Sequence, residues 1–136
     1  MGTQSPAERT LTQIDYIRLT RLASQLEAGA SGTIQELLEN SDLVASAAVP
    51  ATVVTMYTQV LLQDAAGGEP HKVALCYPDD ADPSQGFISV LSPLGAGLLG
   101  LRVGDVARWR TPRGEDRMAH IVQILFQPEA SGDYTT

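Results

Sequence analysis

Cysteine and histidine are scarce in this sequence of 136 residues, which holds one cysteine, Cys76, and two histidines, His71 and His120. A single cysteine excludes an intramolecular disulfide, and one cysteine with two histidines cannot complete a standard four-ligand structural zinc site. We therefore expect neither a bound metal nor a cofactor. A chain that needs no covalent cross-link is typical of the cytoplasm, so the composition predicts a cytoplasmic protein.

Basic and aromatic residues are also few. Nine lysines and arginines stand against sixteen aspartates and glutamates, so the net charge is −7. Binding to DNA or RNA depends on basic side chains that displace counterions from the phosphates. The seven aromatic residues are too scattered to form a platform on which bases could stack. Both shortages argue against autonomous nucleic-acid binding.

Long hydrophobic runs are missing as well. No stretch approaches the ~20 uncharged apolar residues that span a bilayer. The polar opening MGTQSPAERT lacks the basic and apolar regions of a signal peptide, so we expect no membrane association. The 43% of apolar residues are nonetheless enough for a hydrophobic core, which predicts one domain, or a small domain with an appendage.

Helical periodicity dominates the N-terminal third, after a tail over residues 1–10. From Thr12 to Glu27, apolar residues recur at spacings of three and four along one helix face: Tyr16, Leu19, Leu22, Ala23 and Leu26. The glycine-containing residues 29–32 end this helix, and the capping box of residues 33–36 opens a second one. The apolar side of the second helix is Ile34, Leu37, Leu38, Val44 and Ala45. The short loop predicts an antiparallel helical hairpin.

After Val49-Pro50 the pattern changes to strands, because proline cannot continue a helix and β-forming residues follow it. The expected strands are residues 53–63, 71–77, 87–91, 106–110 and 118–126, of which the first two and the last two form hairpins. Ser92 as N-cap and Pro93 in the first turn predict a short helix over residues 94–101, and a polar tail begins at Gln127. The expected class is α+β: a short antiparallel helical hairpin over residues 1–49, then an antiparallel sheet with one short helix over residues 50–136.

Each residue that could act in catalysis or bind a metal ion also has a purely structural explanation. Ser92 lacks the glycines of a nucleophile elbow and fits a helix cap. Cys76 lies in an apolar strand, and the two histidines fall in different hairpins without a nearby nucleophile. Several carboxylates lack the spacing of a calcium loop and fit solvated surfaces: Asp79, Asp80, Asp82, Glu36, Glu39 and Asp42. Gly95-Ala96-Gly97 fits close packing of the short helix on the sheet. The residues alone therefore favour a binding module over an enzyme.

Three segments carry a resemblance to a known family. Residues 88–105, ISVLSPLGAGLLGLRVGD, resemble the signature of the C-terminal domain of the Gre transcript-cleavage factors. Residues 50–56, PATVVTM, and residues 126–134, FQPEASGDY, narrow the resemblance to the Rnk branch, called regulators of nucleoside diphosphate kinase. The resemblance implies an FKBP-like domain on a short antiparallel coiled coil. It also implies binding to bacterial RNA polymerase near the secondary channel.

Two departures from the Gre pattern bear on function. In Gre factors an Asp-Ser-Pro element before the short helix grips the coiled-coil rim of the polymerase's largest subunit. Ser92 and Pro93 match this element, but Leu91 stands at the aspartate position. Gre factors also carry two acidic residues at the tip of a long coiled coil, which help to hold a catalytic magnesium. Here helices of ~16 residues reach only ~24 Å, and the loop of residues 29–32 has no carboxylate.

The sequence thus predicts a non-enzymatic, monomeric transcription regulator that binds RNA polymerase and competes with Gre-type factors without stimulating transcript cleavage. The expected contact surface is Leu91, Ser92, Pro93, Leu94 and the exposed side of Leu98. Core packing of the short helix is the alternative role for these leucines. Two other functions stay open. One is a peptidyl-prolyl isomerase, which needs a deep apolar pocket, and the other is a regulator of nucleoside diphosphate kinase that acts through another protein partner.

Overall fold

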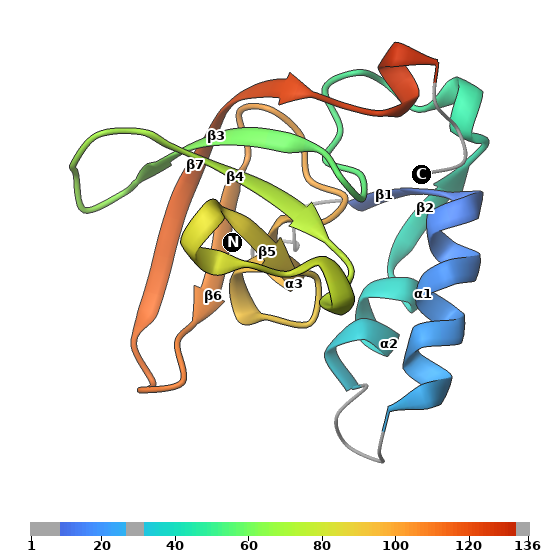
Figure 1. Cartoon of the computed structure of the whole chain (residues 1–136), viewed down its shortest axis with the longest axis horizontal. Coiled ribbons are helices and arrows are strands. Elements are labelled where there is room, and N and C mark those ends of the chain that lie inside the picture. Colours follow the sequence, from blue (N-terminus) through green and yellow to red (C-terminus); the bar gives the residue numbers. More distant parts are fainter. Residues whose placement is uncertain (1–8, 27–31, 133–136) are drawn as a thin grey trace, which may run out of the picture.

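The structure is a computed structural model that describes residues 9–26 and 32–132. A curled five-stranded sheet, in the order β5-β4-β3-β7-β6, surrounds the short helix α3, and α1 and α2 lie beside it with a two-stranded sheet, β1-β2 (Figure 1). The helices are α1 (Gln13–Gln25), α2 (Gly32–Glu39) and α3 (Pro93–Leu98). The strands are β1 (Arg9–Thr12), β2 (Ser41–Val44), β3 (Gln59–Asp64), β4 (His71–Cys76), β5 (Phe87–Ser89), β6 (Val106–Arg110) and β7 (Asp116–Phe126). The predicted α+β class is confirmed.

Helix α1 forms where the periodicity predicts it. Thr12 is its N-cap residue, and its Oγ1 accepts a hydrogen bond of 3.0 Å from the backbone N–H of Asp15. Leu19 and Ala23, from the predicted apolar face, are buried. Helix α2 packs against α1, while residues 29–31 of the predicted connecting loop lie outside the described residues.

The second predicted helix is wrong in its C-terminal half. Helix α2 ends at Glu39, and Val44 belongs to strand β2, with Ala45 following it. Asn40 helps to end the helix, because its Nδ2 donates a hydrogen bond of 2.8 Å to the carbonyl of Glu36. Such side-chain bonds to the backbone compete with further helical turns. The predicted helix continued past Asn40 because the prediction used only the spacing of apolar residues.

Strand pairing replaces the rest of the predicted hairpin. Strand β2 runs parallel to β1, with Leu11 opposite Leu43 in the register. Strand β1 includes Arg9 and Thr10, which the sequence assigned to the tail, and Thr10 and Leu11 are buried. The partners are far apart in the chain, so no local pattern indicates this pairing. The N-terminal region is therefore two short helices and two short strands rather than a pure helical hairpin.

The large sheet confirms both predicted β-hairpins. Strands β3 and β4 pair antiparallel, as do β6 and β7, and β7 also pairs antiparallel with β3. Strand β5 pairs parallel with β4, so the sheet is not purely antiparallel. The first predicted strand begins too early, because residues 55–58 form a turn before β3, closed by a hydrogen bond of 3.1 Å from the N–H of Thr58 to the carbonyl of Thr55. In this turn Tyr57 has a φ of +65°, a left-handed conformation that a strand cannot contain.

The C-terminal segment is less exposed than its polar composition suggests. Gln127, predicted to begin a polar tail, is buried. Its Nε2 donates hydrogen bonds of 2.9 Å to the carbonyl of Pro50 and 2.7 Å to that of Val53. Nearby, Thr55 Oγ1 donates a hydrogen bond of 2.6 Å to Glu129 Oε1. These contacts attach residues 127–129 to the segment that leads into the large sheet.

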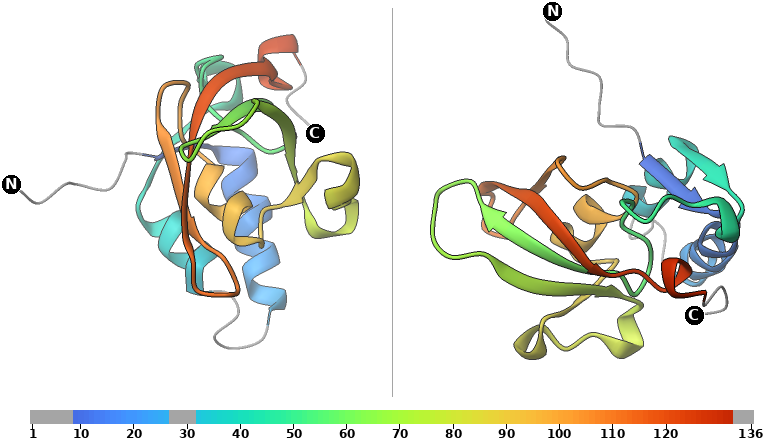
Figure 2. Two further views of the ribbon diagram at one scale, coloured as in Figure 1. Left: turned by 90° about the vertical axis from the view of Figure 1, so that its left-hand side faces the viewer. Right: turned by 90° about the horizontal axis from the view of Figure 1, so that it is seen from above.

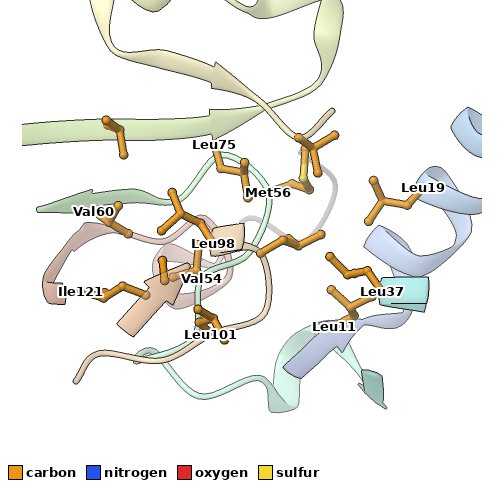
Figure 3. Packing of buried hydrophobic residues seen from close by; sticks show 14 of the residues in the cluster. Leu11, Leu19, Leu37, Val54, Met56, Val60, Leu75, Leu98, Leu101 and Ile121 are labelled. Atoms are coloured by element: carbon orange, nitrogen blue, oxygen red, sulfur yellow. The ribbon is translucent and has the colours of Figure 1, made fainter. Parts of the chain in front are cut away.

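One buried cluster draws side chains from both predicted domains. Leu11, Leu19 and Leu37 of the N-terminal region join the same cluster as Met56 and Leu98 (Figure 3). Two further views show α1 lying alongside the sheet (Figure 2). A division of the chain at residues 49 and 50 stays a prediction, since the hydrophobic core continues across it.

Candidate protein-binding site around the start of α3

The start of α3 is built by local hydrogen bonds that confirm the predicted cap. Ser92 Oγ accepts a hydrogen bond of 3.1 Å from the N–H of Gly95 and donates one of 2.6 Å to the carbonyl of Ser89. Pro93 occupies the first turn of the helix, where its missing N–H costs nothing. Both bonds engage the Ser92 hydroxyl in capping the helix.

Two glycines hold α3 close to the strands around it. A Cβ atom added to Gly95 would lie 2.0 Å from the carbonyl oxygen of Ser89, and one added to Gly97 would lie 2.9 Å from that of Arg108. Contacts this short do not occur between real atoms, so only glycine fits at position 95 without a shift of the backbone. The predicted close packing of Gly95-Ala96-Gly97 is confirmed.

The predicted contact residues divide between the surface and the core. Pro93 is exposed, while Leu91, Ser92 and Leu94 are half-buried. The prediction that Leu98 presents an exposed side is wrong, because its side chain is 0% exposed and belongs to the core. Leu94 lies one turn earlier at the open end of the helix, where the surrounding strands leave part of it accessible.

Two grooves adjoin Pro93. The first, here called the apolar groove, has a volume of about 310 Å³ and is lined by Ala81, Pro83, Ile88, Ser89, Ser92, Pro93, Leu94, Trp109, Thr111 and Pro112. The second, the arginine groove, has a volume of about 400 Å³ and is lined by Arg9, Ile34, Val90, Leu91, Ser92, Pro93, Ala96, Gly97, Arg108, Trp109 and Arg110. Ser92, Pro93 and Trp109 line both grooves, so the two adjoin at these residues.

The three arginines of the second groove have different environments. Arg9 Nη1 donates hydrogen bonds of 2.9 Å to the carbonyl of Ala96 and 2.8 Å to that of Leu99, and burial lowers the pKa of its guanidinium. Arg110 Nε pairs with Asp116 Oδ1 at 3.0 Å on the exposed hairpin. Arg108 is exposed. Among the described residues, no carboxylate lines either groove.

The other candidate residues lie apart from this site. Cys76 is buried, as predicted, and burial raises the pKa of its thiol. His71 on β4 and His120 on β7 are both exposed. The predicted solvated carboxylates are exposed: Glu36, Glu39, Asp42, Asp79, Asp80 and Asp82. Within residues 9–26 and 32–132, no group of three metal-ligating side chains is placed to hold an ion, and no helix is long and apolar enough to cross a membrane.

Sequence reasoning missed one buried carboxylate. Asp15 is only 2% exposed, and its Oδ2 accepts a hydrogen bond of 3.2 Å from the N–H of Met56. Burial raises the pKa of Asp15 to about 6. The Met56 N–H opposes this rise, and the nearby charge of Glu129 adds to it. In the sequence, Asp15 is only an acidic residue three positions after Thr12, which fits a first helical turn, because Met56 lies far along the chain.

Comparisons with known proteins agree with the predicted resemblance. The family model for the transcription elongation factor GreA/GreB C-terminal region matches residues 49–126. The regulator of nucleoside diphosphate kinase of Escherichia coli K12 is 37% identical over 97 residues, which span 71% of each chain. The transcription elongation factor GreA of Solidesulfovibrio magneticus is 36% identical over 101 residues, which span 74% of this chain and 61% of that factor.

A solved structure supports the same relationship. The prokaryotic transcription elongation factor GreA/GreB from Nitrosomonas europaea matches with a TM-score of 0.74 and 31% sequence identity. The match covers 90% of this chain and all of the other. The region matched by the family model, residues 49–126, contains β3 to β7, α3 and nearly all of the lining of both grooves.

Proposed function

Because the chain belongs to the GreA/GreB C-terminal family, we propose that it is a non-enzymatic transcription regulator that binds bacterial RNA polymerase near its secondary channel. The observation that carries the proposal is the position of the two adjoining grooves around Pro93, whose lining lies almost entirely inside the family-matched region. A groove with an exposed rigid residue at its centre is suited to a protein surface. The relatives matched by this region include factors named for transcription elongation.

The docking surface is formed by Leu91, Ser92, Pro93 and Leu94, and its partner is the coiled-coil rim of the polymerase's largest subunit. Pro93 is exposed at the centre of the surface, with the half-buried leucines on either side of it in sequence. Leu91 lines the arginine groove and Leu94 lines the apolar groove. Leu91 offers an apolar contact where Gre factors have an aspartate. In this proposal the curled sheet with α3 is an FKBP-like module that serves as the docking domain.

The short N-terminal helices support docking without stimulation of transcript cleavage. Helix α1 has 13 residues and α2 has 8, so at 1.5 Å per residue they extend about 20 Å and about 12 Å. The exposed Glu36 lies near the start of α2, and residues 27–31 lie outside the described residues. We propose that these helices carry no acidic pair to the polymerase active centre, and that the protein competes with Gre-type factors for the same rim.

The other two predicted functions have less support from the site. The apolar groove contains Trp109 as its single aromatic lining residue among the described residues. A peptidyl-prolyl isomerase would need a deeper aromatic pocket. Regulation of the nucleoside diphosphate kinase level through another protein partner has only the name of relatives behind it. We therefore keep the polymerase-binding proposal.

The test is a competition on purified bacterial core RNA polymerase with a fluorescently labelled Gre factor. The wild-type chain should displace the label, and the same samples should show no cleavage of backtracked transcripts. Combining Pro93→Ala with Leu94→Glu should weaken displacement at least about tenfold, because it removes the rigid contact and places a charge in the apolar groove. Failure of the wild type to displace the label at tens of micromolar contradicts polymerase binding. Cleavage activity contradicts the non-cleaving role.

A further inference from the structure

We propose that the two adjoining grooves together take a polymerase segment in which an apolar side chain lies next to carboxylates. The apolar side chain enters the apolar groove, and the carboxylates meet the arginine groove. This inference rests on the proposed function, and it specifies the chemistry of the partner surface.

The geometry of the groove favours a single segment that contacts both halves. Ser92, Pro93 and Trp109 line both the apolar groove and the arginine groove. Pro93 is exposed between the two halves, and its ring and the Ser92 cap fix its position at the start of α3. A chain that crosses Pro93 therefore presents neighbouring side chains to two chemically different surfaces.

The apolar half favours an uncharged side chain. No ionisable residue is among the described residues that line it, and its walls include Pro83, Ile88, Leu94 and Pro112. A charged group placed there would lose hydration without gaining an ionic partner. An apolar side chain would exchange water for contacts with Leu94 and Trp109.

The arginine half favours carboxylates. Arg9 already bonds the carbonyls at the end of α3, and Arg110 pairs with Asp116. For Arg108, the described residues provide no ion pair within 4.0 Å. Its exposed guanidinium is therefore available to a carboxylate of the partner, and guanidinium and carboxylate form strong, directional pairs.

The arginine groove adjoins a hairpin whose net charge is opposite in sign to that of the whole chain. Residues 102–126, which include β6 and β7, carry five arginines and three carboxylates, a net charge of +2 in a chain with a net charge of −7. An acidic partner surface is repelled by most of the protein and attracted to this hairpin. Such complementarity steers association and fixes orientation.

The experiment compares Arg108→Glu with Arg113→Glu in the same polymerase competition. Both variants change the charge of the same hairpin by the same amount, but Arg113 lies in the exposed turn between β6 and β7 and lines neither groove. We expect Arg108→Glu to weaken displacement about tenfold or more, and Arg113→Glu to weaken it less than about threefold. Wild-type displacement should also lose more on addition of salt than displacement by Arg108→Glu, because the variant lacks the screened interaction.

A second variant tests the apolar half. Pro112 is exposed and lines the apolar groove, so Pro112→Glu adds a charge there with little effect on the core. It should weaken displacement more than Arg113→Glu does. Thermal unfolding of each variant verifies that it folds. If the wild type displaces the label and all three variants match it, the partner chemistry is wrong and the proposed function stands. If the wild type itself fails, both proposals fall.

Discussion

Helices α1 and α3 are held to the rest of the fold in two different ways. Near the start of α1, the buried carboxylate of Asp15 accepts a hydrogen bond from Met56. Helix α3 is held by close backbone approach to the large sheet at Gly95 and Gly97, and by hydrogen bonds from Arg9 of β1 to the carbonyls of Ala96 and Leu99. Leu19 and Ala23 also pack α1 into the core, but among these polar and close contacts only the one at α1 involves a carboxyl group with a raised pKa. The proposed docking surface, Leu91 to Leu94, lies at the start of α3, so its geometry should persist over pH changes that affect the contact of Asp15 with Met56.

The largest effect should come from Gly95→Ala. The new Cβ would lie 2.0 Å from the Ser89 carbonyl oxygen, so either α3 or β5 must move. We expect a loss of more than about 3 kcal/mol in the free energy of unfolding, at or above the usual range for overpacking. Denaturant titration measures it. In Gly97→Ala the new Cβ would lie 2.9 Å from the Arg108 carbonyl oxygen, so this variant should lose less free energy of unfolding. Equal stability of Gly95→Ala and the wild type would show that α3 is not held by close packing.

The next effect concerns the pH dependence of Asp15. Its pKa is about 6 in the folded protein and near 3.8 in the unfolded chain, so the folded state binds the proton more tightly. The stability that this group contributes is present below pH 4 and is lost as the pH rises through 6. Asp15→Asn keeps an acceptor for the Met56 N–H without this loss.

The free energies of unfolding of Asp15→Asn and the wild type should therefore be measured from pH 4 to pH 7. The difference should shift by about 2 kcal/mol in favour of the variant as the pH rises. Glu129 and Arg18, whose charges also act on Asp15, are present in both proteins. A difference that stays constant over this range would show that the carboxyl group titrates normally and that the attachment of α1 is not ionisation-dependent.

A smaller effect is expected for Arg9→Met. The variant keeps much of the apolar stem but removes the donors to the carbonyls of Ala96 and Leu99. The loss should be about 1.5 kcal/mol, and Arg9→Lys should recover part of it. Because the bonded carbonyls do not titrate, the loss should be the same at pH 5 and pH 7. A loss that changes between these pH values would remove the contrast between the two helices.

The elements that could be predicted from sequence are those set by neighbouring residues. Ser92 and Pro93 define the start of α3 through bonds within a few positions, and Thr12 does the same for α1. Both β-hairpins follow from strand composition with turns between them. The parallel pairing of β1 with β2 depends on partners far apart in the chain, and apolar spacing at Val44 and Ala45 fitted a helix equally well.

The candidate site was predictable only where its residues are neighbours in the sequence. The segment from Leu91 to Leu94 was found because it lies in one continuous motif. Leu94 and Leu98 share a helix face, and only the curl of the sheet decides which of them reaches the core. Trp109 and Arg108 join the site through the packing of β6 against α3, which no spacing in the sequence records. The sequence feature that could have indicated this part of the site is the cluster of arginines after residue 101.

The most direct test of the proposed docking through the start of α3 is photocrosslinking to core RNA polymerase from single positions of the chain. A photoreactive amino acid would replace Pro93 at the docking surface or, as control, the exposed Val122 on β7, which lines neither groove. We expect a crosslink from position 93 to the largest subunit, which an excess of Gre factor abolishes, and none from position 122. Crosslinking from position 122 without crosslinking from position 93 would contradict the claim that the groove around α3 is the docking surface.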